Sequence, residues 1–424
     1  MDVKTLSDLG PGERSAIFDR DAGVEAIRDD VRVILDRVRE EGDVALREFS
    51  AEFDNVDVGA LEITDAAEQA AATVDATIHE AIDDAARNVR EFHEQQVRTD
   101  WRKAFEDGRE LGRRFRPLER VGVYVPGGAA AYPSSALMGA IPAIVAGVDQ
   151  VVVTTPPAEE INPVTLAAIH IAGADEVYQI GGAQAIAAMA YGTETVPSVQ
   201  KIVGPGNRWV TAAKAEVQGD VSIDFLAGPS EVLVVADDTA DPGFVAAELL
   251  TQAEHDEHAA VVAVTDDESM ATAVAEAVDE QLPRRDRQET IEQALTNDAS
   301  GIFLARSMSE AILFADEFAA EHLSIQVADP ETVLDRIDSA GSIFVGPHTP
   351  VAAGDYASGT NHVLPTNGLA KRHGGLSVDE FVRSTTIQRL DRDGLESIGE
   401  TITTLADAEG LEAHAESVRR ILDE

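Results

Sequence analysis

The sequence predicts an α/β protein built from two successive open, mainly parallel Rossmann-like α/β units, with a helical N-terminal region and a helical C-terminal tail. Over the middle of the chain, short continuous runs of β-branched residues alternate with helical segments, which is typical of parallel strands covered on both faces. The composition is 44% hydrophobic but only 5% aromatic, so the cores must be aliphatic. The 32 glycines fit close packing of helices on sheets.

Four regions follow from these patterns. Residues 1–114 read as a helical N-terminal region, because apolar residues recur there at helical spacing. Residues 115–228 form the first α/β unit and residues 229–365 the second, so that the two read as distant copies of one plan. The expected strands are 121–125, 150–155, 176–180 and 201–203 in the first unit, and 231–236, 260–265, 302–305, 323–327 and 341–345 in the second.

Residues 366–424 read as a highly charged helical tail. Its apolar positions Ile398, Ile402, Leu405 and Leu411 form a stripe that an isolated tail could not bury. We therefore expect the tail to pack against the body of its own chain or against another subunit.

The charge is strongly negative. Asp and Glu total 78 against 33 Lys and Arg, which gives a formal net charge of -45, and only five of the basic residues are lysines. The acidity is spread along the chain, which indicates adaptation to concentrated salt, where counter-ions screen self-repulsion. An ordinary acidic cytosolic enzyme is the alternative. In both cases nucleic acid and anionic membranes are poor partners, because both would be repelled.

The chain has no cysteine. This excludes disulfides, cysteine-based zinc sites and thiolate nucleophiles, so any metal must rest on His, Asp, Glu or Gln side chains. The first residues lack the apolar core of a signal peptide. The longest apolar stretch, 136–148, is too short to span a bilayer. We expect a soluble, cytoplasmic protein.

The polar run from Gly354 to His362 is the strongest functional signal. It combines a carboxylate, Asp355, with an imidazole, His362, between glycines, a mixture that neither a core strand nor a plain surface loop requires. The run follows an expected strand. Because ligands of open α/β sheets bind at the carboxyl ends of strands, we expect this loop to lie there.

Two further clusters contain histidine. Gln252 and His255 lie three residues apart in a segment with helical periodicity, where both could bind one metal, and His258 would continue that face. Glu321 and His322 form an adjacent acid and imidazole, suited to general acid–base chemistry. Taken alone, the first pattern is more often a solvated helix end, and adjacent Glu-His pairs are common by chance.

Three glycine-rich turns end expected strands of the first unit and open helical segments, at 125–128, 181–185 and 203–207. Backbone N–H groups at such turns can receive a phosphate. None matches the G-x-G-x-x-G fingerprint of dinucleotide sites, so each is also compatible with a tight turn. Together they indicate a nucleotide-like ligand.

Several strings together resemble one family, L-histidinol dehydrogenase. They are Gly122–Gly128, Gly181–Ile186, Gly204–Asn207, Ala227–Val232, Gln252–His255, Glu321–Leu323 and Gly354–Pro365, in the family's order and over nearly the whole chain. The resemblance implies the last step of histidine biosynthesis, a four-electron oxidation of L-histidinol to L-histidine through the aldehyde, with two NAD per turnover.

The resemblance also implies a set of site residues. One zinc ion per subunit would be held by Gln252, His255, Asp355 and His414, and would hold the imidazole and amine of the substrate. His322 would remove the alcohol proton and Glu321 would activate a water for the aldehyde. Further positions match the family by contact with substrate or cofactor: Ser230, His362 and Glu409 for substrate, and Tyr124, Gln184 and Asn207 for NAD.

In the family the tail reaches into the neighbouring subunit, so Glu409 and His414 would complete the active site of a partner in a homodimer. This would also cover the apolar stripe of the tail. Without the resemblance, His414 reads as a surface histidine.

Two departures from the family pattern stand out. Val351 follows Pro350 where the family commonly has Glu, and His373 with Gly374 precedes Gly375 where an aromatic and Ser are common. Either could alter substrate fit or dimer contacts.

Two other functions were weighed. A metal-dependent hydrolase using Gln252, His255 and Asp355 with Glu321 as base would leave the glycine-rich turns without purpose. A metal- or nucleotide-binding scaffold would not explain the Glu321–His322 pair. NAD dependence separates the dehydrogenase from the hydrolase, and turnover of any kind separates both from the scaffold.

Overall fold

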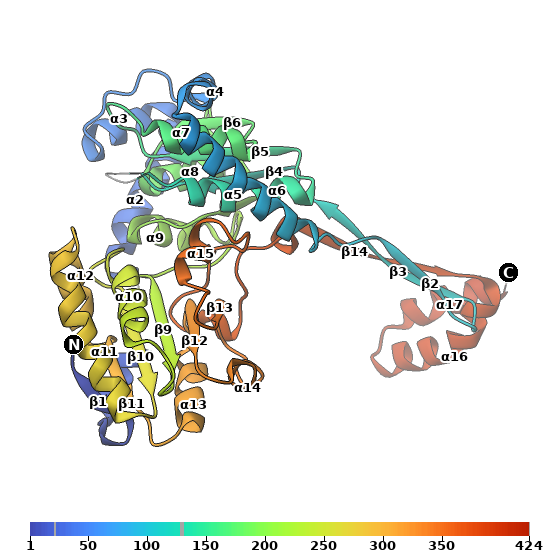
Figure 1. Cartoon of the computed structure of the whole chain (residues 1–424). Coiled ribbons are helices and arrows are strands. Elements are labelled where there is room, and N and C mark those ends of the chain that lie inside the picture. Colours follow the sequence, from blue (N-terminus) through green and yellow to red (C-terminus); the bar gives the residue numbers. More distant parts are fainter. Residues whose placement is uncertain (21–22, 128–130, 424) are drawn as a thin grey trace. The chain divides into compact units, whose positions relative to one another are not determined.

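The computed structural model describes residues 1–20, 23–127 and 131–423 (Figure 1). The chain divides into two compact units, the larger formed by Met1–Gln96 with Glu119–Phe381 and the smaller by Val97–Leu118 with Val382–Glu424. Gly128, which ends the first glycine-rich turn of the sequence analysis, lies outside the described residues.

The larger unit contains two parallel sheets, which confirms the predicted α/β class. The first sheet in the chain has the order β6-β5-β4-β7-β8 and the second has the order β1-β11-β10-β9-β12-β13. When β1 is left out and the five strands of each sheet are numbered from 1 to 5 in chain order, both sheets have the spatial order 3-2-1-4-5. The shared order agrees with two copies of one plan.

The nine predicted strands of both sheets lie where the sequence places them, with ends that shift by at most one residue. The five-stranded sheet contains β4 (Arg120–Tyr124), β5 (Gln150–Thr155), β6 (Glu176–Gln179), β7 (Lys201–Val203) and β8 (Ser222–Ile223). The six-stranded sheet contains β1 (Val3–Thr5), β9 (Glu231–Ala236), β10 (Ala260–Thr265), β11 (Gly301–Leu304), β12 (His322–Gln326) and β13 (Ser342–Val345). The sequence analysis missed β1 and β8, because two or three residues are too few to show a period.

Helices cover both faces of each sheet. In the six-stranded sheet, Val232 and Val234 pack on one face against α10 (Pro242–Ala253) and α11 (Glu268–Gln281). Leu233 and Val235 pack on the other face, against α1 (Pro11–Phe18) and α13 (Met308–Phe318). Because the strands are buried on both faces, they read as continuous apolar runs in the sequence.

The five-stranded sheet is covered in the same way, with α2, α8 and α9 contributing to the core on one of its faces. Besides α1, α10, α11 and α13, the described helices of the larger unit are α2 (Arg28–Glu41), α3 (Asp43–Phe53), α4 (Thr64–Thr73), α5 (Ala76–Glu94), α6 (Pro133–Ala146), α7 (Pro163–Ala172), α8 (Gly182–Tyr191), α9 (Arg208–Val217), α12 (Gln288–Thr296), α14 (Pro330–Leu334) and α15 (Val351–Tyr356). Short 3-10 helices are Leu6–Asp8, Glu25–Ile27, Leu282–Arg284, Leu369–Lys371 and Val378–Phe381.

The smaller unit is an antiparallel sheet of order β14-β3-β2, with β2 (Trp101–Ala104), β3 (Arg109–Pro117) and β14 (Val382–Leu390), followed by α16 (Arg392–Ala408) and α17 (Glu412–Asp423). The sequence analysis described both of these segments as helical. Their strands are mostly exposed and carry polar residues on both faces, so no alternating apolar pattern marks them.

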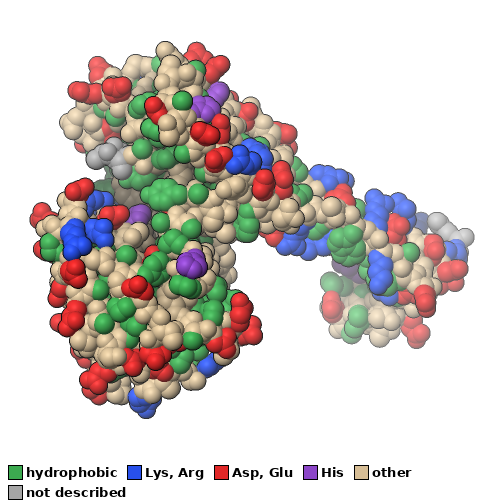
Figure 2. All heavy atoms as spheres, viewed as in Figure 1, with side chains coloured by type: hydrophobic (Ala, Val, Ile, Leu, Met, Phe, Trp, Pro, Cys, Tyr) green, Lys and Arg blue, Asp and Glu red, His purple; other side chains and the backbone are tan. Residues whose placement is uncertain are grey.

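The surface carries the acidity foreseen from composition. Figure 2 shows Asp and Glu side chains scattered over the visible face rather than gathered in one patch. Among residues 1–20, 23–127 and 131–423, no helix is both long enough and apolar enough to cross a membrane.

Candidate functional site

The catalytic candidates lie at the amino edge of the six-stranded sheet. His322 is the first residue of β12 and Glu321 directly precedes it, and the neighbouring strand β9 begins at Glu231. Asp355 contacts His322 at this edge, so the expectation that the run from Gly354 to His362 lies at the carboxyl ends of the strands was wrong. After β13, helix α15 leads the chain back, so that Asp355 reaches the side chain of His322.

Glu321 and Glu231 hold each other in place. The backbone N–H of Glu231 donates to Glu321 Oε2 at 2.9 Å, and the backbone N–H of Glu321 donates to Glu231 Oε2 at 3.3 Å. Both side chains are almost fully buried, at 9% and 1% exposure. Burial raises the pKa of Glu321 to about 8, because a desolvated carboxylate loses the stabilisation that water gives its charge.

His322 is held between a carbonyl and two carboxylates. Its Nδ1 lies 3.0 Å from the carbonyl oxygen of Glu231 and 3.6 Å from Glu321 Oε2, and its Nε2 lies 3.4 Å from Asp355 Oδ1. Burial by itself would lower the pKa of His322, but the carboxylates of Glu321 and Asp355 outweigh it and raise the pKa to about 9. Nε2 is buried and makes no well-directed hydrogen bond to a described residue.

Asp355 belongs to the short helix α15 rather than to a loop. The helix begins at Val351, which is buried and donates its backbone N–H to Glu248 Oε2 of α10 at 2.8 Å. At Asp355, burial alone would raise the pKa, but His322, His362 and His255 together hold it below its usual value. The carboxylate of Asp355 is therefore kept ionised chiefly by the protonated imidazole of His322.

Gln252 lies in the last turn of α10, with 2% exposure, and its Oε1 is buried without a hydrogen-bond partner among the described residues. His255 lies just beyond the helix, which ends at Ala253, so the expected common helical face of Gln252, His255 and His258 was wrong. Burial lowers the pKa of His255, against the charge of Asp355. His258 is exposed and lies in a turn closed by Asp256.

His362 is close to the same group. Its Nε2 lies 3.3 Å from Ser135 Oγ, and its backbone N–H points at the sulfur of Met138 at 3.2 Å, so the run meets α6 here. Burial lowers the pKa of His362 to about 4, and the nearby charges of His322 and His255 act in the same direction. The imidazole is therefore neutral near pH 7.

The other residues discussed in the sequence analysis lie in different parts of the chain. Ser230 directly precedes β9, next to the Glu231 that contacts the catalytic pair. Glu409 and His414 belong to the smaller unit, at the end of α16 and in α17. His373 is exposed and beside Gly374 on a smaller cavity.

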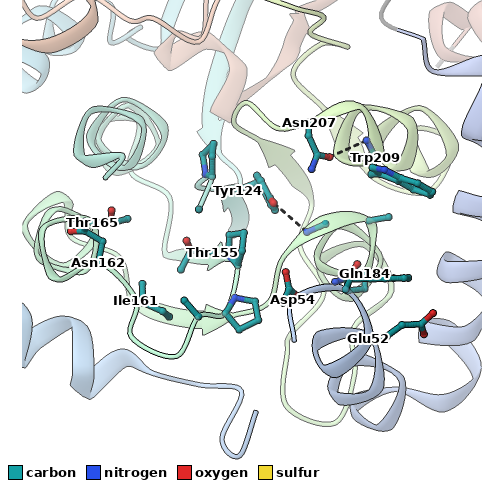
Figure 3. A pocket seen from close by; sticks show the side chains of 18 of the residues that line it. Glu52, Asp54, Tyr124, Thr155, Ile161, Asn162, Thr165, Gln184, Asn207 and Trp209 are labelled. Atoms are coloured by element: carbon teal, nitrogen blue, oxygen red, sulfur yellow. Dashed lines mark hydrogen bonds between the residues drawn. The ribbon is translucent and has the colours of Figure 1, made fainter. Parts of the chain in front are cut away.

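The three positions predicted to line a cofactor site do line one cavity. Tyr124, Gln184 and Asn207 surround a space of about 1070 Å³ at the carboxyl ends of β4 and β5 and at the amino ends of α8 and α9 (Figure 3). In the order β6-β5-β4-β7-β8, the connections reverse direction beside β4. This is where ligands bind in open parallel sheets.

Local sequence explains the geometry of this cavity. Tyr124 Oη accepts the N–H of Gly182 at 3.2 Å, and burial raises the pKa of Tyr124 to about 12. Asn207 caps α9 by accepting the N–H groups of Trp209 and Val210 at 3.0 and 3.2 Å. Gly204 has φ +109°, and a Cβ there would lie 2.2 Å from the carbonyl oxygen of Tyr124, so the turn requires glycine.

Sequence reasoning missed several polar residues of these sites. Glu231 contacts Glu321, Arg20 pairs with Glu231, and Glu248 accepts the N–H at the start of α15. Asp54 lines the cavity with a buried Oδ2 that has no partner among the described residues. Of these four residues, only Glu231 lies in one of the strings that carry the family resemblance, Ala227–Val232. A charged residue at the start of an otherwise apolar strand is the signal that could have found it.

Comparisons with known proteins decide the family. The sequence profile described as histidinol dehydrogenase matches residues 19–421. The histidinol dehydrogenase of the halophilic archaeon Haloarcula marismortui is 70% identical over 420 residues, which are 99% of each chain. The chain belongs to the histidinol dehydrogenase family.

Further relatives agree with this membership. The histidinol dehydrogenase of Halobacterium salinarum is 68% identical over 418 residues, 99% of this chain and 98% of that one. The crystal structure of histidinol dehydrogenase from Elizabethkingia anophelis has a TM-score of 0.94 at 38% identity and covers 100% of this chain and 97% of that chain. The predicted family is thus confirmed, and with it an oxidoreductase of the last step of histidine biosynthesis.

Proposed function

We propose that this chain oxidises L-histidinol to L-histidine through the aldehyde, with two NAD as hydride acceptors and one zinc ion per subunit. The observation that carries the proposal is the convergence of Glu321, His322 and Asp355 at one sheet edge, in a chain whose relatives are histidinol dehydrogenases. Overall, one alcohol and one water give a carboxylate, two NADH and three protons.

The side chains at the site suit a divalent metal. Gln252 offers a buried amide oxygen without a partner, and His255 and Asp355 add a nitrogen and a carboxylate. Within the described part of the chain, no three His, Cys, Asp or Glu side chains gather as a metal site. We propose that the amide of Gln252 and the imidazole of His414 complete the set.

The cofactor and the metal supply the hydride acceptor and a positive charge that orients the imidazole and amine of the substrate. The chain's own residues handle protons. His322 would take the alcohol proton at Nε2, because Nδ1 is occupied by the carbonyl of Glu231. A cation bound at Asp355 would weaken the ion pair that raises the pKa of His322 and so favour its basic form.

Glu321 has a separate task. Its raised pKa of about 8 makes its carboxylate a suitable acceptor for a proton of the water that adds to the aldehyde. The resulting gem-diol loses a second hydride and a proton to give the acid. His362, which is neutral, would hydrogen-bond the substrate without adding a positive charge beside the metal.

NAD would occupy the cavity lined by Tyr124, Gln184 and Asn207. The cavity lies at the N-termini of α8 and α9, which pack on the five-stranded sheet. Backbone N–H groups at helix N-termini favour a pyrophosphate. Its volume of about 1070 Å³ is adequate for most of a dinucleotide.

We infer a homodimer with shared active sites. Glu409 and His414 lie in the smaller unit, which exposes Leu405, Leu411 and Ile421 at 58%, 44% and 58% on α16, on the turn after it and on α17. Exposed apolar side chains on neighbouring helices favour contact with a second copy. A cytoplasmic location and activity at high salt complete the proposal and stay predictions.

The test is NADH formation from L-histidinol in concentrated potassium chloride, before and after removal of metal by a chelator. Two NADH per histidinol, lost on chelation and restored by zinc, is the expected result. Folded protein that gives no NADH from histidinol would overturn the proposed reaction, and activity that survives complete chelation would overturn the metal.

A further inference from the structure

At the amino edge of the six-stranded sheet, side-chain carboxylates accept the N–H groups of the residues at the start of β9 and β12. Here the N–H groups of Glu231 and Glu321 donate to each other's carboxylates across β9 and β12. We call this reciprocal pair of hydrogen bonds the clasp. Because an unpaired buried N–H is costly, the clasp is the local solution to a strand edge that lies inside the protein.

The carboxylate of Glu231 does more than complete the clasp. Its Oε1 accepts the backbone N–H of Asn367 at 2.7 Å and lies 3.2 Å from Nε of Arg20, whose side chain is 6% exposed. Arg20 in turn donates to the carbonyl of Phe318 at 2.7 Å and lies over the ring of Phe318. Glu231 thereby joins the end of α13, the segment after His362 and the start of β12.

We propose that Glu231, held by Arg20, is a positioning residue for the catalytic pair Glu321–His322. The clasp fixes Oε2 of Glu321, and the carbonyl of the same Glu231 fixes Nδ1 of His322. The atoms left to exchange protons are Oε1 of Glu321 and Nε2 of His322. The proposal rests on the proposed roles of Glu321 and His322.

The two catalytic residues depend on Glu231 in different ways, which makes the proposal specific. His322 contacts the backbone carbonyl of Glu231, which any side-chain substitution keeps. Glu321 likewise receives the backbone N–H of Glu231 at its Oε2, but its own N–H donates to the carboxylate of Glu231, so this second bond depends on the side chain. Loss of the carboxylate should therefore harm water activation at the aldehyde more than proton removal from the alcohol.

The kinetic test compares Glu231→Gln and Glu231→Asp with the wild type, using L-histidinol and L-histidinaldehyde as substrates. We expect kcat from the aldehyde to fall about 10–100-fold, since small misplacement of a catalytic group has effects of this size. KM for histidinol should change less than about threefold. Free aldehyde, trapped with semicarbazide during histidinol oxidation, should increase. Asp keeps the charge but is one methylene short, so it should behave like Gln.

Asp43→Asn is the matched control. Asp43 is also a largely buried carboxylate, with 11% exposure, and accepts hydrogen bonds from Thr193 and Thr195 away from both sites. The Asp43→Asn variant should be less stable than the wild type but should not release more aldehyde. If the Glu231 variants keep the wild-type ratio of aldehyde to alcohol rates, whatever their overall rate, Glu231 is structural only and the proposal is refuted.

Amide hydrogen exchange gives a readout that does not need turnover. In Glu231→Ala, peptides containing the N–H groups of Glu321 and Asn367 should exchange faster, while those around Asp43 should not. Unchanged exchange at Glu321 would refute the clasp even if the enzyme were impaired. If the wild type does not oxidise histidinol at all, the proposed function fails, but the exchange experiment still decides on the clasp.

Discussion

The buried ion pair of Lys214 and Asp224 gives the sharpest prediction on stability. Lys214 Nζ lies 2.7 Å from Asp224 Oδ1 and donates to the carbonyl of Gly204 at 2.6 Å, and Asp224 Oδ2 accepts the N–H of Gly204 at 2.9 Å. The two side chains are 4% and 1% exposed. The pair thus holds both backbone groups of the glycine that the turn before Asn207 requires.

Lys214→Met should lower the free energy of unfolding by about 3–5 kcal/mol. The substitution leaves the carboxylate of Asp224 buried with a single backbone donor, and breaking one side of a buried pair has effects of this size. The double variant Lys214→Met/Asp224→Asn should regain part of the loss, because Asn can still accept the N–H of Gly204 and no charge remains. KM for NAD should rise in both, since Asn207 at the end of this turn lines the cavity proposed for NAD.

Thermal and denaturant unfolding at molar potassium chloride measures the loss. Arg284→Gln serves as the control, because its pair with Glu280 is exposed at 68% and 72% and should contribute less than about 0.5 kcal/mol. A loss below about 1 kcal/mol for Lys214→Met would show that the carboxylate finds water or another donor, and would refute the reasoning. A normal KM for NAD would show that the turn keeps its shape without the pair.

Three further outcomes follow from the structure. Burial raises the pKa of Asp54 to about 6, so the stabilising effect of its neutral form is present below about pH 4 and lost as the pH rises through 6. Asp54→Asn should therefore gain about 1 kcal/mol of stability at pH 8, after allowance for solvent screening, and only about half as much at pH 5, as unfolding at both pH values will show. His322→Gln should lower kcat by about 10²–10⁴-fold. If dimers share active sites, a mixture of this variant with the inactive His414→Asn variant should recover about a quarter of wild-type activity. No recovery in verified mixed dimers would contradict shared sites. With a net charge of -45, the melting temperature should rise with potassium chloride, and a flat salt dependence would contradict halophilic adaptation.

Much of the fold could be predicted because its strands are buried on both faces. Runs such as Glu231–Ala236 and Ala260–Thr265 are continuous and aliphatic, and their predicted bounds are those observed. The strand β14 could not be predicted in this way, because Val382–Leu390 exposes both of its faces and carries no apolar period. Its partner β3 lies more than 260 residues earlier in the chain, and no local pattern encodes such a pairing.

The candidate site could also be predicted only in part. The sequence by itself determined which chemical groups were available. Without cysteine, the proposed acid–base and metal chemistry had to rest on residues such as Glu321, His322 and Asp355, and their strings identified the family. Only the tertiary structure decided where they meet. Helix α15 brings Asp355 back to the amino edge of the sheet, and there β9 places Glu231 against Glu321. Burial at this edge then sets the pKa values, since desolvation and neighbouring charge are properties of the folded chain and of no single residue.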